Sequence, residues 1–237
     1  MSPVHPDIQS SRGVLITAYQ QLPDLGQELL QLLSIVYVPI SKQLLEACFK
    51  QYCDQRDRDQ RGAAKPAGNA FIKKLMQQLC RHNLALTKKQ SVLCHPLISE
   101  IATRDAVRAG RFEAMVQIVE TRQPVGQSPW HLGIRFYQHD NELLREIRLG
   151  IYRQDLDFIE QQLEFCAQHI FGPVQMNLSL AVDLICNNPF DPDWTRTLRS
   201  TPDLYETVQE NLLMNSLLDL LPAAGPFALL EEDCANF

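Results

Sequence analysis

Between residues 26 and 110 the sequence alternates in a way that predicts three helices, a β-hairpin and a fourth helix. The helical segments carry apolar side chains three and four residues apart, the spacing that gathers them on one face of a helix. Two short strand-like runs follow the third segment and are separated by a polar turn, as in a hairpin. We expect helices at 26–36, 41–52, 69–82 and 96–110, and strands at 84–87 and 91–94.

Boundary residues support these positions. Ser41 and Asn69 are residue types that cap helix N-termini, and Pro96 is well placed to open a helix that Gly110 closes. Residues 54–68 are polar, alternate in charge and end in Gly and Pro, so we expect a mobile surface loop there.

The order of these elements predicts a mainly α fold, beginning with a winged helix-turn-helix domain over residues 1–122. In that arrangement the small β-hairpin is the wing, and the third helix holds the position that meets DNA.

The second half, residues 123–237, has the punctuation of an α-helical repeat domain. Ser128–Pro129 and Thr201–Pro202 are helix starts 73 residues apart, close to two periods of a tetratricopeptide-like helix pair. Gly172–Pro173 and Asn187–Pro189 are helix stops. The last helix, from residue 202 to 221, is strongly apolar near its end, so we expect the domain to be truncated at the C-terminus.

The net charge also changes between residues 122 and 123. Residues 1–122 hold 16 of the 22 Lys and Arg and 11 of the 28 Asp and Glu, a net charge of +5, which leaves −11 for residues 123–237. A basic half suits an anionic partner, but it also suits docking of the acidic half, and this count leaves both hypotheses open.

The seven cysteines have no CxxC spacing and are expected to be reduced. Two thiols and two imidazoles close to the hairpin form a zinc-type set, but their spacing matches no standard zinc finger, and a buried thiol pair with a histidine that caps or packs explains them better. We therefore expect no metal and no cofactor. The four residues are Cys80, His82, Cys94 and His95.

The sequence holds no strong combination of residues that is typical of a catalytic site. His131 and His139 have no nucleophile beside them, and the carboxylates Asp155 and Asp157 fit a helix start. The acidic run 231–233 has no phosphate-binding loop to work with. We expect no enzyme and no small-molecule substrate. Without a membrane span or signal peptide in the sequence, we also expect a cytoplasmic protein.

The run FIKKLMQQLCRHNLALTKKQSVLCHPLISEIATRDAV, with the leucine-rich segments before it, resembles the winged helix that follows the nucleotide-binding core of signal-transduction ATPases. His95, Pro96 and Leu97 match the point where the wing runs into the next helix. A winged helix that continues into repeats also resembles the N-terminal region of bacterial Swi/Snf-type helicases. The chain lacks the nucleotide-binding loop, so nucleotide binding is not implied.

These patterns favour a non-catalytic regulatory or protein-interaction module, the N-terminal part of a larger bacterial ATPase or helicase. Its partner would be another protein or another domain of the same polypeptide. The alternative is a nucleic-acid-binding module in which the third helix and the wing contact DNA. The residues expected at that contact are Lys73, Lys74, Gln77, Gln78, Arg81, Lys88 and Lys89.

Overall fold

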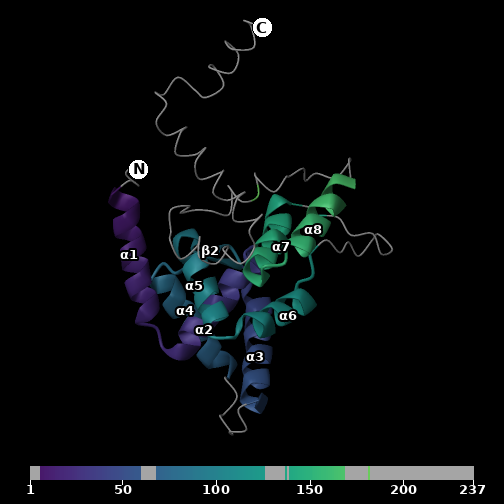
Figure 1. Ribbon diagram of the computed structural model, residues 1–237. Coiled ribbons are helices and arrows are strands. Elements are labelled where there is room, and N and C mark those ends of the chain that lie inside the picture. The colour runs from purple at the N-terminus through teal and green to yellow at the C-terminus, as the bar shows by residue number, and fades with distance from the viewer. Residues whose placement is uncertain (1–5, 60–67, 126–136, 138, 169–180, 182–237) are drawn as a thin grey trace, which may run out of the picture.

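The computed structural model describes residues 6–59, 68–125, 137, 139–168 and 181 (Figure 1). Within these ranges the fold is mainly helical, with eight helices and one small antiparallel sheet. None of the described helices is both long and apolar enough to cross a membrane.

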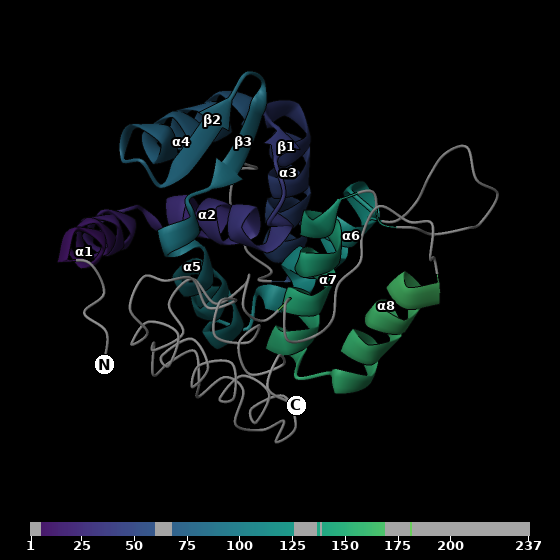
Figure 2. The same ribbon diagram turned by 90° about the horizontal axis from the view of Figure 1, so that it is seen from above.

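The helix α2 (Asp24–Val36) is the centre of the first half. Every residue from Glu28 to Val36 is buried, which agrees with a segment that is apolar on nearly all sides. In Figure 2, α4 (Asn69–Arg81) and the hairpin lie on one side of α2 and α5 (Pro96–Arg108) lies on the other. The helix α1 (Pro6–Gln20) packs Leu15 and Tyr19 against the same core.

The sheet confirms the expected hairpin and adds a third strand. Strands β2 (Ala85–Lys88) and β3 (Ser91–Cys94) are antiparallel, with Ala85 opposite Cys94. A two-residue strand β1 (Ile40–Ser41) pairs with the other edge of β3, so the strand order is β1-β3-β2.

The helix α3 (Lys42–Asp59) begins as expected but is longer than the sequence indicates. The Ser41 hydroxyl accepts a hydrogen bond from the Leu44 backbone N–H at 3.2 Å, so Ser41 is the expected N-cap. The first part of the stretch expected to be a loop continues as helix, and Arg56 in this part is held by Glu28 of α2 at 2.8 Å. Residues 60–67 lie outside the described part.

The start of α4 differs from the prediction by one residue. Gly68 occupies the N-cap position in an extended conformation, and Asn69 is the first helical residue, without a side-chain capping bond. The next helix agrees with prediction: Pro96 is its first residue, and Gly110 turns the chain with φ of +66°. The helix α6 (Phe112–Arg122) follows that turn.

In the second half, α7 (Asp140–Arg153) and α8 (Leu156–Gln168) pack together as a helix pair. Gly150 permits the close contact, because a Cβ there would lie 2.5 Å from Cγ1 of Ile159. The helix starts and stops predicted at residues 128–129, 172–173, 187–189 and 201–202 lie outside the described residues.

The buried side chains form two clusters, and α7 contributes to both. Leu149 and Tyr152 join the large cluster of the first half, whereas Leu144, Ile147 and Ile151 join a smaller cluster with α8. The division at residue 122 stays a prediction, and α7 is the described helix that connects the two cores.

Candidate nucleic-acid interface and the network between the halves

The helix α4 separates its side chains into two faces. Ile72, Leu75, Met76 and Leu79 are buried, and their three- and four-residue spacing fixes the rotation of the helix on the core. That rotation turns the polar positions outward. Lys73, Lys74, Gln77 and Arg81 are exposed and Gln78 is half-buried.

The hairpin adds two more cations. Lys88 ends β2 and Lys89 lies in the turn with φ of +55°, and both side chains are exposed. The structure therefore places all seven residues of the predicted interface on α4 and the neighbouring hairpin, with six of them exposed.

These cations have no ion-pair partner among the described carboxylates. Ion pairs elsewhere in the described ranges hold Arg56 to Glu28, and Arg153 to Glu113 at 3.1 Å. No such pair involves Lys73, Lys74, Arg81, Lys88 or Lys89. Within the described part of the chain, the acidic half does not neutralise this face.

Two of the four residues of the zinc-type set, His95 and Cys94, have structural roles in the fold. The His95 Nδ1 accepts a hydrogen bond from the Leu97 backbone N–H and so caps α5. Cys94 is buried, and burial raises the pKa of its thiol to about 12. Cys80 is half-buried and His82 is exposed at the end of α4. No three candidate metal ligands gather within the described ranges.

The two carboxylates at the start of α8 are accounted for locally, whereas the histidine before α7 is not. Asp155 accepts a hydrogen bond from the Phe158 backbone N–H at 2.9 Å, and Asp157 lies in the first turn of α8. His139 precedes α7 without forming a side-chain cap. His131 and the acidic run 231–233 lie outside the described residues.

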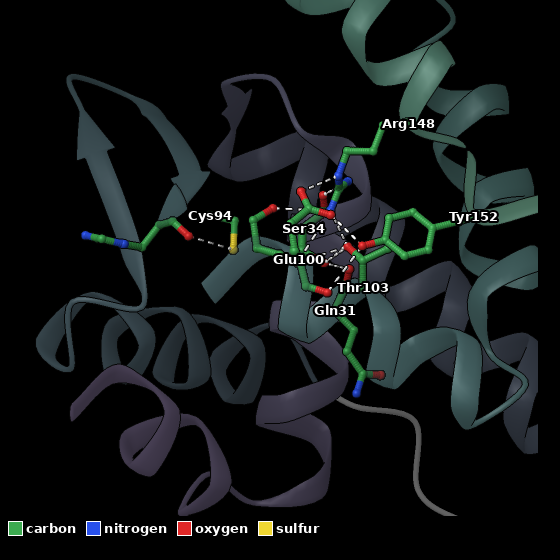
Figure 3. A network of polar contacts seen from close by, with 9 residues as sticks. Gln31, Ser34, Cys94, Glu100, Thr103, Arg148 and Tyr152 are labelled. Carbon is green, nitrogen blue, oxygen red and sulfur yellow. Dashed lines mark hydrogen bonds and ion pairs between the residues drawn. The ribbon is translucent and has the colours of Figure 1, made fainter. Parts of the chain in front are cut away.

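The two halves are joined by a buried polar network that the sequence analysis did not identify (Figure 3). Arg148 of α7 is fully buried, and its Nε donates to Glu100 of α5 at 2.7 Å. Its Nη1 donates to the Ser34 carbonyl of α2 at 2.8 Å, and its Nη2 donates to the Thr103 hydroxyl at 2.5 Å. One side chain thus connects α7 with both α2 and α5.

Glu100 is satisfied from a second direction. The Tyr152 hydroxyl donates to the other Glu100 oxygen at 2.5 Å. Burial and the neighbouring carboxylate both raise the pKa of Tyr152, so the phenol keeps its proton. Burial alone would lower the pKa of Arg148, but Glu100, Tyr152 and Tyr37 together more than offset this, and the guanidinium stays charged.

In these ion pairs, each half contributes charges of the sign opposite to its own net charge. The acidic half supplies the cations Arg148 and Arg153, and the basic half supplies the anions Glu100 and Glu113. Specific pairs therefore hold α7 in place, and the cations of the α4 face take no part. The sequence feature that could have indicated this network is an arginine at position 148, on the helix face that also carries Leu144 and Ile151.

Comparison with known proteins gave no match to a family model, to a curated protein or to a solved structure.

Proposed function

We propose that the chain is a non-catalytic binding module that presents α4 and the hairpin to a nucleic acid. The observation that carries the proposal is the cationic face itself: five exposed Lys and Arg side chains on neighbouring elements have no described carboxylate partner. Phosphate contacts supply most of the affinity of nucleic-acid binding, and exposed cations on one surface provide them.

The order of elements supports the same proposal. Helix α2, strand β1, helices α3 and α4, and the β2–β3 hairpin follow one another as in a winged helix-turn-helix. In such a domain α4 would lie in the recognition position, with Gln77 and Gln78 able to reach base edges and the lysines and Arg81 to reach phosphates. The proposal includes the sequence-based hypothesis that the module precedes a larger ATPase or helicase region.

A regulatory, protein-interaction role is the second candidate. The Arg148 network favours it, because a helix pair fixed to the first half makes a rigid support for a partner protein or for another domain of the same polypeptide. A tetratricopeptide-like arrangement of the second half belongs to this candidate.

Fluorescence anisotropy with a labelled DNA duplex distinguishes the two candidates. We expect binding at low salt that Arg81→Gln weakens. Arg108→Gln is the matched control, because Arg108 is an exposed arginine at the end of α5 that is remote from the hairpin. Absence of duplex binding at low salt would remove the nucleic-acid proposal and leave the protein-interaction candidate.

A further inference from the structure

A pocket of about 480 Å³ lies between the start of α3, the outer face of α4 and the sheet. These elements gather on one side of α2 in Figure 2. Its volume falls within the range of roughly 300 to 1,000 Å³ that is typical of small-molecule sites. Parts of the chain that are distant in sequence, at Lys42, Lys73 and Val92, contribute to the same concave surface.

The charged residues of the pocket are mainly basic. Lys42, Lys73 and Arg81 line it together with one carboxylate, Glu46, which is half-buried. None of the three cations forms an ion pair with a described carboxylate, Glu46 included. Like charges held around one cavity repel each other, and a bound anion relieves that repulsion.

The interior of the pocket is less polar than its charged residues suggest. Met76 and Val92 line it, and both are also part of the core. Cys80 also lines the pocket; burial raises the pKa of its thiol, and the Lys42 ammonium opposes that effect. A ligand would therefore meet apolar side chains inside and cations outside.

We propose that this pocket binds a small amphipathic anion, a molecule with an apolar body and one carboxylate or phosphate group. The apolar body contacts Met76 and Val92, and the anionic group takes hydrogen bonds from Lys42, Lys73 and Arg81. The proposal depends on the pocket alone and does not require the chain to bind nucleic acid.

The position of the pocket also implies regulation. Lys73 and Arg81 belong both to the pocket and to the face proposed for phosphate contacts. An anion bound there would neutralise these two cations and oppose a nucleic-acid phosphate. Occupancy of the pocket should therefore weaken duplex binding by the same face.

The direct test is a titration of the full chain with decanoate, read by NMR of ¹³C-methyl methionine. The chain has five methionines. Met76 lines the pocket, and Met115, buried in α6, is an internal control. Met76→Leu identifies the Met76 resonance. We expect a saturable shift of the Met76 methyl group and no comparable shift of Met115.

Charge variants make the test specific. The double variant Lys73→Gln/Arg81→Gln should weaken decanoate binding by roughly tenfold or more, since it removes two charge-assisted hydrogen bonds. Lys74→Gln/Lys88→Gln removes the same charge outside the pocket and should leave the affinity unchanged. An unmoved Met76 signal, or equal binding of decyltrimethylammonium, would overturn the proposal.

A second measurement separates this proposal from the function proposed above. Decanoate should lower the affinity of the wild-type chain for a labelled duplex and should have little effect on the Lys73→Gln/Arg81→Gln variant. If the Met76 signal shifts but no duplex binds, the pocket stands and the nucleic-acid proposal fails. If duplex binds but Met76 does not respond, the pocket proposal fails.

Discussion

Replacing Arg148 with Met tests how the two halves are held together. The substitution removes a guanidinium that is 0% exposed and donates to Glu100, the Ser34 carbonyl and the Thr103 hydroxyl. Glu100 then loses its cationic partner in a site where its side chain is only 9% exposed. Removal of one partner of a buried ion pair costs about 3 to 5 kcal/mol of unfolding free energy.

A double-mutant cycle shows whether the cost comes from the pair itself. Glu100→Gln alone leaves the Arg148 charge uncompensated and should cost a similar amount. If the two effects were additive, the double variant would lose about 6 to 10 kcal/mol of unfolding free energy. Because neutralising both partners leaves no unpaired buried charge, we expect a loss of only about 5 kcal/mol. The difference from the middle of the additive range is a coupling energy of about 3 kcal/mol.

Urea denaturation followed by far-UV circular dichroism measures these free energies. Arg108→Met is the matched control, because Arg108 is 61% exposed and its 3.5 Å pair with Asp105 should contribute less than about 1 kcal/mol. A loss below about 1 kcal/mol for Arg148→Met, or additive effects in the cycle, would show that the network does not hold α7 in place.

Three further predictions concern the packing, pH dependence and reactivity of the fold. Gly150→Ala should destabilise the chain by about 1 to 3 kcal/mol through overpacking between α7 and α8, whereas Gly13→Ala, in open space on α1, should stabilise it by roughly 0.5 to 1 kcal/mol in the same denaturation assay. Burial lowers the pKa of His95 below its usual value of 6.5. The stability that the neutral imidazole contributes should therefore be complete above pH 6.5 and should decline as the pH falls through the lower pKa of the folded state. Denaturation at several pH values should show this decline in the wild type but not in His95→Asn. Peptide mapping after brief iodoacetamide treatment should find Cys94, with a pKa raised to about 12, modified much more slowly than the half-buried Cys80, and equal rates would contradict the burial of Cys94.

The local spacing of apolar residues was sufficient to predict the helices α2, α4 and α5 and the hairpin. In α4, Ile72, Leu75, Met76 and Leu79 occupy one face, and that periodicity is written in the sequence itself. The same pattern identifies which side chains of α4 point outward, and all seven residues of the candidate interface lie on the elements where they were expected.

Long-range contacts account for what the sequence did not reveal. Arg148 and Ser34 are 114 residues apart, and no local spacing indicates that a guanidinium will bind that carbonyl. The extension of α3 to Asp59 depends partly on the contact of Arg56 with Glu28 on another helix. Lys42 lines the pocket with Lys73 only because β1 and β3 bring the start of α3 to the hairpin.

The salt dependence of duplex binding tests the central claim, that the cationic face of α4 and the hairpin is free to meet phosphates. If all five cations contact phosphates, the logarithm of the binding constant should fall with the logarithm of salt concentration with a slope of about −4.5. The triple variant Lys73→Gln/Lys74→Gln/Arg81→Gln should reduce that slope by about 2.7. A wild-type chain that does not bind at low salt, or a slope that the triple variant leaves unchanged, would contradict the account.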